Sequence, residues 1–326
     1  MHWTLAEFSA MDAQYTFQIK RQDEAWAKGV SLDSSSCNNF QNYLRNFQFQ
    51  RQRFGYLYGT FEEEDGGEKG EAKGKTKVRV ECIYEPPQEA NPNGGFFPLE
   101  NEDQDKVEQL ASMLRLKKVG WIFGHPPREK GFQLSSTEVI MGAELQLEAA
   151  NGVEPTPFVT IKVTVADDGT VSFEAFQMSL LCMEMVAEQA LEVGPKPGFC
   201  YVNETFTAIQ EGKDSKTVEN NFFLTLVPIV QHQSKVFICE FPFANRDLGP
   251  PQTKDDLKRQ LAKSGSQGWD FIDLLSDFSL LLYLCNFLDF ETDMPKICQS
   301  VINRDIPLDD GYKLIISGIA GLEGSY

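Results

Sequence analysis

Hydrophobic and polar residues along this chain follow two periods, one typical of helices and the other typical of strands. Between Cys37 and Gln50, the apolar residues Phe40, Leu44 and Phe47 recur at helical spacing, which predicts a helix with one buried face. The same spacing, with capping residues around it, predicts three more helices. They are expected at residues 103–118, 135–152 and 178–194, the last of them ending at Gly194.

Alternation of apolar and polar residues predicts the strands of a sheet. A hairpin is expected within residues 158–177, because apolar alternation continues on both sides of Asp168-Gly169. Residues 269–290 have apolar side chains nearly all round, which is typical of one buried helix. The other strands are expected at residues 53–62, 78–86, 119–124, 221–230 and 234–243.

Two stretches carry no clear period. Residues 1–36 are polar and irregular, and residues 62–77 are charged and rich in glycine, which indicates a solvated loop between two strands. Helices mixed with mostly antiparallel strands give an α+β architecture. We therefore expect an N-terminal arm at 1–36, a first domain at 37–194 and a C-terminal α+β domain at 195–326.

The charge of the chain excludes two classes of partner. Its 326 residues carry a formal net charge of -18, and a phosphate backbone is bound by surplus Lys and Arg that this chain lacks. The same argument excludes an anionic membrane surface. We therefore expect no nucleic-acid binding. We also expect no membrane insertion, since the longest apolar run, residues 278–288, is too short to span a bilayer.

Cysteine usage indicates reduced thiols. The seven cysteines are scattered, odd in number and free of any Cys-x-x-Cys pair, so they are expected to pack as small core residues. No charged-then-apolar leader opens the sequence, so a soluble intracellular protein is expected. The cysteines are residues 37, 82, 182, 200, 239, 285 and 298.

Residues 119–138 look like half of a zinc site. An apolar strand leads to His125-Pro126, and Ser135-x-x-Glu138 follows after a short loop. A catalytic zinc ion needs three protein ligands, yet the chain has only three histidines, in separate segments. There is also no Gly-x-Ser-x-Gly elbow, no P-loop and no strand-linked Gly-x-Gly-x-x-Gly. Hydrolytic chemistry therefore has little support from the residues alone.

His125 and Glu138 each have two interpretations. His125 is either a metal ligand or a polar residue at a strand end that bonds to backbone or water, and the second is favoured because one ligand does not make a site. Glu138 is either a carboxylate ligand or part of a capping box with Ser135, which contributes about 1 kcal/mol to helix stability. The capping role explains both residues without a metal.

Eight short blocks occur in order from about residue 37 to the C-terminal region. They read FGYLYG, IYEPPQ, KKVGWIF, LSSTE, VSFEAFQMS, NNFFLTLVPI, FPFANRD and SDFSLLLYLCNFLD. In this order they resemble the nuclear protein localization protein 4 family, whose members recognise ubiquitin for the AAA segregase known as valosin-containing protein. The resemblance implies an MPN-like (JAMM/Mov34) domain with a mostly antiparallel sheet flanked by helices, followed by a C-terminal α+β domain.

The resemblance also implies that the zinc site of active relatives is altered in this sequence. Active MPN isopeptidases carry a Glu on the first strand, a His-x-His-Pro turn and a Ser-x-x-Asp. These positions correspond here to Gln52, Phe123 and His125, then Ser135 and Glu138, with one extra residue in the loop between them. The Gln52 amide cannot act as a general base, and the Phe123 ring offers no lone pair to a metal. An MPN-type pseudoenzyme is therefore expected, with no catalytic residue, no bound metal and no cofactor.

The family resemblance implies a binding role in the nucleus and cytoplasm, including the periphery of the endoplasmic reticulum. Expected partners are ubiquitin or polyubiquitin chains, an ubiquitin-fusion-degradation adaptor and the valosin-containing-protein ATPase. A ubiquitin segment is expected in an apolar groove, although core packing is the alternative role for at least half of the candidate residues. The groove candidates are Phe173, Phe176, Gln177, Phe222 and Phe223.

Departures from the family pattern limit these expectations. We expect the ubiquitin-like domain that docks on the ATPase and the Cys-x-x-Cys zinc finger of animal members to be absent, so the chain resembles the plant or algal short form. Direct docking on the ATPase therefore has little support from this sequence. Two other readings stay open: an active zinc metallo-deubiquitinase, and a purely architectural MPN subunit of a larger complex.

Overall fold

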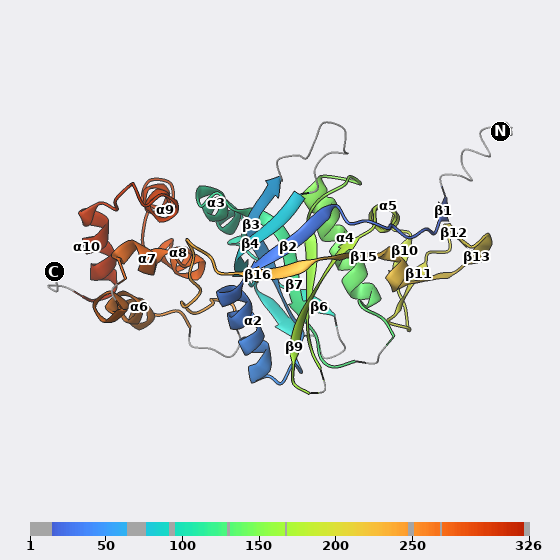
Figure 1. The fold of residues 1–326 in the computed structure, drawn as a ribbon, viewed down its shortest axis with the longest axis horizontal. Helices are drawn as coiled ribbons and strands as arrows, with labels where there is room; N and C mark the ends of the chain where they lie inside the picture. The colour runs from blue at the N-terminus through green and yellow to red at the C-terminus, as the bar shows by residue number, and fades with distance from the viewer. Residues whose placement is uncertain are drawn as a thin grey trace.

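A large mixed sheet forms the centre of the molecule in this computed structural model, which describes residues 15–63, 76–90, 95–128, 131–166, 168–246, 251–267 and 269–322. Its eight strands lie in the order β15-β9-β8-β7-β3-β4-β2-β16 (Figure 1). The strands are β2 (Ala27–Asp33), β3 (Arg53–Glu63), β4 (Thr76–Tyr84), β7 (Lys117–Gly124), β8 (Val159–Val165), β9 (Val171–Met178), β15 (Leu224–Val227) and β16 (Ile229–His232).

The predicted α+β class and the predicted hairpin are confirmed. β8 and β9 pair antiparallel across Asp168 and Gly169, and Gly169 has the positive φ of 82° that this turn requires. β3 pairs antiparallel with both β4 and β7, whereas β7–β8, β2–β4 and β2–β16 are parallel. The sheet is therefore mixed, with antiparallel pairing at its centre.

One short segment supplies both ends of this sheet. β15 and β16 are the two terminal strands in the sheet order, yet only Pro228 separates them in the sequence. The N–H of Val30 in β2 donates to the carbonyl oxygen of Pro228 at 2.8 Å. The sheet must therefore curl until its ends approach each other, which gives it a barrel-like shape. We call residues 224–232 the seam segment.

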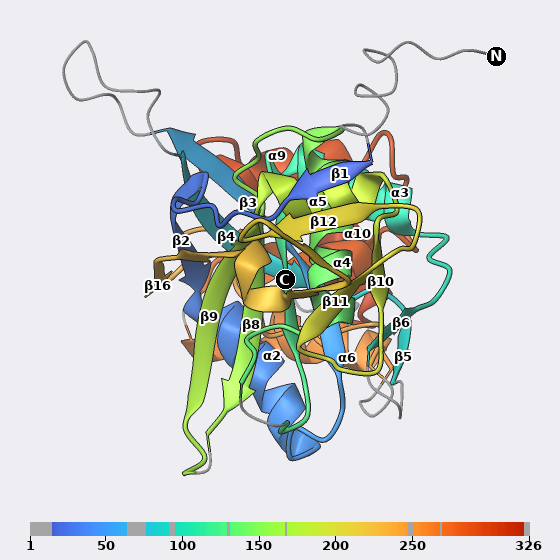
Figure 2. The same cartoon turned by 90° about the vertical axis from the view of Figure 1, so that its right-hand side faces the viewer.

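Three smaller sheets lie outside the central one. β10 (Leu191–Val193), β11 (Phe199–Val202) and β14 (Thr217–Glu219) form one, and β5 (Gln88–Ala90) pairs with β6 (Phe96–Pro98) in another. Figure 2 shows β10 and β11 beside α4, on the side away from the C-terminal helices. The third sheet contains β1 (Thr16–Gln18), β12 (Thr207–Gln210) and β13 (Lys213–Ser215).

The helices pack around the sheet in two groups. α4 (Ser136–Ala150) and α5 (Leu180–Ala187) lie with the small sheets, whereas α3 (Gln104–Met113) packs with the C-terminal helices (Figure 1). α2 (Ser34–Asn46) starts where Asp33 accepts the backbone N–H of Ser36, and buries Phe40 and Leu44 against the sheet. The C-terminal helices are α6 (Lys254–Gln267), α7 (Phe271–Leu275), α8 (Phe278–Leu284), α9 (Met294–Ile302) and α10 (Asp310–Ile319).

The N-terminal arm is more regular than the sequence suggested. Residues 27–33 form β2, an inner strand of the central sheet, and residues 16–18 form β1. Val30 and Leu32 point to the same side of β2 and are buried there. Lys28 and Gly29 interrupt the alternation of apolar and polar residues, so the sequence pattern did not indicate this strand. The central sheet thus takes strands from all three segments that were expected to be separate. The expected loop at 62–77 lies mostly outside the described residues.

Three other expected elements are corrected. The helix at 178–194 stops at Ala187, because Gln189 adopts a left-handed φ of 58° and the chain turns into β10. The helix predicted to end at Gln50 likewise stops at Asn46, where Gln48 and Phe49 have positive φ. Within the described residues, the strand expected at 234–243 reduces to one bridge between Ile238 and Asp277.

The single buried helix expected at 269–290 is two helices, α7 and α8, separated by Ser276 and Asp277. Asp277 is the N-cap of α8, and its carboxylate accepts the backbone N–H groups of Ser279 and Leu280. The other carboxylate oxygen accepts the N–H groups of Glu240 and Phe241 at 2.7 and 2.9 Å. The bonds to this one buried carboxylate therefore account for the break between α7 and α8. They also bind the backbone at Glu240 and Phe241, where a strand was expected.

A second buried carboxylate joins the sheet to the segment before α6. Glu85 follows β4, is fully buried, and forms ion pairs with Arg53 of β3 and with Arg246. Asn245 donates its side-chain amide to the Glu85 carbonyl oxygen at 3.0 Å, and the Arg246 guanidinium stacks on the Tyr43 ring at 4.3 Å. Asn245 and Arg246 of the FPFANRD block therefore connect this segment to β3, β4 and α2. We call the ion-paired group of Glu85, Arg53 and Arg246 the latch.

Two predictions from composition can be compared with the structure. All seven cysteines are free thiols, and five of them are buried, as the sequence suggested. None of the helices among the described residues combines the length and the apolar character needed to cross a bilayer.

Candidate functional site

A cleft of about 520 Å³ opens where β7 ends and α4 begins. β7 runs to Gly124, where a side chain would strike Leu44 of α2, and the chain then passes to His125 and Pro126. α4 starts after Ser135, and the predicted capping box with Glu138 is present in full. The cleft is lined by Gln52, Gly95, His125, Pro126, Pro127, Arg128, Phe132, Ser135, Ser136, Thr137, Glu138, Val193, Gly194, Pro195 and Pro197.

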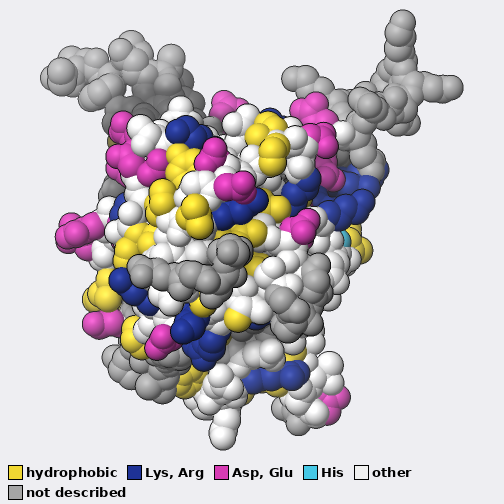
Figure 3. Space-filling model, turned by 90° about the vertical axis from the view of Figure 1, so that its left-hand side faces the viewer, with side chains coloured by type: hydrophobic (Ala, Val, Ile, Leu, Met, Phe, Trp, Pro, Cys, Tyr) yellow, Lys and Arg dark blue, Asp and Glu magenta, His cyan; other side chains and the backbone are white. Residues whose placement is uncertain are grey.

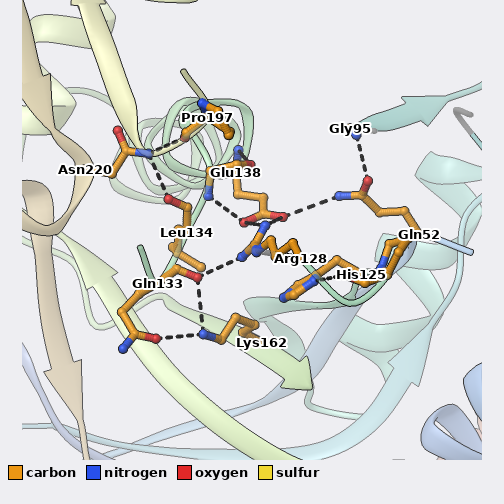
Figure 4. A network of polar contacts seen from close by, with 12 residues as sticks. Gln52, Gly95, His125, Arg128, Gln133, Leu134, Glu138, Lys162, Pro197 and Asn220 are labelled. Atoms are coloured by element: carbon orange, nitrogen blue, oxygen red, sulfur yellow. Dashed lines mark hydrogen bonds and ion pairs between the residues drawn. The ribbon is translucent and has the colours of Figure 1, made fainter. Parts of the chain in front are cut away.

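A guanidinium group lies at the centre of this site (Figure 4). Arg128 Nη1 donates to both carboxylate oxygens of Glu138, at 2.8 and 2.9 Å, and its Nη2 donates to the carbonyl oxygen of Gln133 at 2.8 Å. Glu138 is only 1% exposed, and it also accepts the backbone N–H of Ser135 at 2.8 Å. Its carboxylate is therefore fully engaged by the protein itself.

His125 makes one of the backbone contacts expected of a polar residue at a strand end. Its Nδ1 lies 2.7 Å from the carbonyl oxygen of Pro126, which can only accept, so Nδ1 carries the proton. Burial of the ring and the charge of Arg128 hold the His125 pKa below its ordinary value, so the imidazole is neutral at pH 7. Its Nε2 is buried and has no hydrogen-bond partner among the described residues.

The positions of Gln52 and Phe123 are filled by protein contacts. The Gln52 side-chain oxygen accepts the N–H of Gly95 at 2.6 Å, and its amide nitrogen lies 3.5 Å from Glu138 (Figure 4). The Phe123 ring is completely buried, stacks on Trp121 at 4.8 Å between ring centres, and meets Phe96 edge-on at 5.3 Å. Gln52 therefore connects two residues that line the cleft, Gly95 and Glu138, whereas Phe123 packs in the hydrophobic core.

These residues do not fit a catalytic zinc ion. Of the five corresponding positions, only His125 and Glu138 offer ordinary zinc ligands, and Glu138 is already paired with a cation. Within the part of the chain that the structure describes, no group of three or more His, Cys, Asp and Glu side chains is arranged to hold a metal ion. The arrangement instead forms a rigid cleft with proline walls and one guanidinium group.

The Arg128–Glu138 pair makes a testable contribution to stability. Arg128→Ala is expected to lower the free energy of unfolding by about 2 kcal/mol, because a buried carboxylate loses its counter-ion. Arg128→Lys should recover only part of this loss, since a single ammonium group cannot replace both Nη1, which bonds Glu138, and Nη2, which bonds the Gln133 carbonyl oxygen. Urea unfolding measures both changes. The matched control is Arg45→Ala on the exposed face of α2, and equal effects at the two positions would contradict the assignment.

The groove candidates separate into two sets. Phe176, Gln177 and Phe223 are buried, and Gln177 uses its amide to bond the carbonyl oxygens of Thr156 and Phe158. The core-packing alternative therefore describes these three in the present structure. Phe173 and Phe222 are half-buried, and Arg21 stacks on the Phe222 ring at 4.6 Å. A ubiquitin groove that includes Phe173 and Phe222 stays a prediction.

Three residues of the site were not anticipated from the sequence. Arg128 lies in a loop without periodicity, and only its position after two prolines marks it. Gly95 and Phe96 come from a turn-rich connection, and nothing in their local sequence shows that they pack against Gln52 and Phe123.

Comparison with known proteins identifies related sequences. The model of the NPL4 family matches residues 53–223. The Nuclear protein localization protein 4 homolog of Dictyostelium discoideum is 35% identical over 305 residues, which cover 92% of this chain and 49% of that protein. NPL4-like protein 1 of Arabidopsis thaliana is 31% identical over 309 residues, 93% of this chain and 70% of that protein. The human Nuclear protein localization protein 4 homolog is 28% identical over 310 residues, 82% of this chain and 47% of that protein. The matched region thus spans about half of the Dictyostelium and human relatives.

Proposed function

Since the chain belongs to the NPL4 family, we propose that it is a non-catalytic adaptor that presents polyubiquitinated proteins to an AAA segregase. In this role it binds ubiquitin or polyubiquitin together with an ubiquitin-fusion-degradation adaptor, in the nucleus and cytoplasm. The ATPase, the valosin-containing protein, then unfolds the substrate for ubiquitin-dependent degradation, including degradation from the endoplasmic reticulum.

One observation supports the non-catalytic part of this proposal most directly. The Arg128 guanidinium is bound to both oxygens of Glu138, at the position that corresponds to a zinc ligand in active MPN enzymes. A metal ion there would have to displace a bidentate ion pair whose carboxylate is almost completely buried. Isopeptide hydrolysis also needs a general base, and the Gln52 amide supplies none.

The binding part of the proposal follows from the cleft and the family. Prolines at positions 126, 127, 195 and 197 give the cleft rigid apolar walls, which suit an extended chain better than a reacting bond. An adaptor needs shape and exposed apolar surface, and it does not need a nucleophile.

Two measurements on the purified chain test the proposal together. We expect saturable binding to polyubiquitin that strengthens when the ubiquitin-fusion-degradation adaptor is added, and we expect no cleavage of diubiquitin with or without added zinc. Chelator-sensitive cleavage would instead indicate an active metallo-deubiquitinase. Binding to the adaptor without any affinity for ubiquitin would indicate a purely architectural subunit, and both results would reject the proposal.

A further inference from the structure

Asn151 and Gly152 end helix α4 with a backbone arrangement that engages the Gly152 nitrogen. Asn151 has a left-handed φ of 55°, and its N–H donates to the carbonyl oxygen of Glu148 at 3.2 Å. The N–H of Gly152 donates to the carbonyl oxygen of Leu147 at 3.0 Å. Together these two bonds form a Schellman motif, which satisfies carbonyl groups that the end of a helix leaves without partners.

An Asn-Gly pair is chemically labile wherever its backbone is free to move, because glycine places no side chain beside the reacting nitrogen. The Gly152 nitrogen would form a bond to the Asn151 Cγ atom, the Cγ–Nδ2 bond would break, and ammonia would leave with the proton of the Gly152 N–H. Water would then open the cyclic imide at either of its carbonyl carbons. The product is aspartate or isoaspartate at position 151.

The fold restrains the reacting nitrogen, although the side chain is open to water. Asn151 is exposed, and no atom lies within 4 Å of the position that a Gly152 side chain would take. The Gly152 nitrogen, however, holds its proton in the bond to Leu147 and cannot turn toward Cγ while that bond lasts. Reaction therefore requires the last turn of α4 to open first, which is a local event at a helix end.

The product would not restore this helix end. Aspartate or isoaspartate adds a negative charge at the C-terminus of α4, where the helix dipole is already negative and Glu148 is close in the sequence. Isoaspartate also inserts a methylene group into the backbone before Gly152, which changes the spacing that the two bonds of the motif need. The reaction is therefore a one-way step.

We propose that Asn151-Gly152 is a latent deamidation site, which is closed while the last turn of α4 is formed and reacts when that turn opens. The reaction needs only this chain and water, so it does not depend on the proposed function.

Peptide mapping by mass spectrometry tests this proposal on the full chain. The protein is incubated at mildly alkaline pH with and without urea, and each deamidated peptide gains the mass difference between a hydroxyl and an amino group. The other Asn-Gly pair of the sequence, Asn93-Gly94, lies outside the described residues and is the reference in urea, where both pairs should react at similar rates. We expect Asn151 to react at least about tenfold more slowly in the folded protein than in urea. Equal rates of Asn151 deamidation in the two conditions would overturn the proposal.

Two glycine variants separate local opening from unfolding of the whole protein. Ala149→Gly weakens the last turn of α4 at an exposed residue. It should raise the rate of Asn151 deamidation in the folded protein by about fivefold, which corresponds to about 1 kcal/mol.

The matched control is Ala262→Gly, which makes the same substitution at an exposed residue of α6. α6 belongs to the C-terminal helices, whose side of the molecule faces the viewer in Figure 3, whereas α4 lies beside the central sheet (Figure 1). The control should therefore leave the rate at Asn151 unchanged. Equal acceleration by the two variants would show that only global unfolding exposes the site. That result, or no acceleration by Ala149→Gly, would refute the proposal.

Discussion

Glu85→Ala is expected to destabilise the protein by about 4 kcal/mol, one of the two largest effects we predict. The reason is charge. Glu85 is the counter-ion of both Arg53 and Arg246, and its removal leaves two guanidinium groups together in a site with little access to water. Glu85→Gln keeps the shape and one acceptor, so it should cost less. Denaturant unfolding measures these changes, with exposed Glu89→Ala as the control, for which we expect a change within about 0.5 kcal/mol.

The same carboxylate predicts how stability depends on pH. Burial alone would raise the Glu85 pKa, but the charges and hydrogen bonds of Arg53 and Arg246 outweigh it and lower the pKa below its ordinary value of 4.5. The stabilisation is therefore present above pH 4.5 and is lost as the pH falls through the lowered pKa. The difference in stability between native protein and Glu85→Ala should shrink in acid. A difference that stays constant down to low pH would contradict the latch.

Asp277→Ala is expected to have a similarly large effect, again about 4 kcal/mol. Asp277 caps α8, and its four backbone N–H donors would lose their acceptor in a buried site. The control is Asp309→Ala, which removes an exposed N-cap of α10 with a single bond to Gly311 and should cost about 1 kcal/mol. Thermal and urea unfolding compare the two. Equal losses would show that Asp277 acts only as an ordinary cap.

The pH dependence of Asp277 has the opposite sign to that of Glu85. Complete burial raises the Asp277 pKa to about 6, although its four N–H donors favour the charged form. Its contribution is therefore fully present below the ordinary pKa of 3.8 and declines as the pH rises through about 6. Asp277→Asn removes this titration. The free energy of unfolding of this variant should therefore fall less than that of the native protein as the pH rises from 3.8 to about 6.

Elements with a strong local signal were predictable from the sequence. The capping box of Ser135 and Glu138 fixed the start of α4, and Asp168-Gly169 fixed the β8–β9 hairpin. In both cases the determining contacts lie within a few residues of each other. α2 was also predicted, although its end was placed too late, because positive φ values at Gln48 and Phe49 leave no periodic trace.

Elements set by distant contacts were not predictable. β2 becomes a strand because it is placed between β4 and β16, which come from positions far along the chain. The break between α7 and α8 depends on backbone donors from Glu240 and Phe241, which no local pattern indicates. At the candidate site, the absence of zinc chemistry stays a prediction from Gln52 and Phe123, whereas the ion pair of Arg128 with Glu138 could be found only from the fold.

The seam segment has a consequence for biosynthesis. Because β15 and β16 are the last strands to be translated and sit at opposite ends of the sheet, a nascent chain that stops before residue 224 exposes two unprotected borders at once. Emergence of nine further residues from the ribosome covers both. Premature termination just upstream of residue 224 should therefore yield an aggregation-prone product that depends on chaperones.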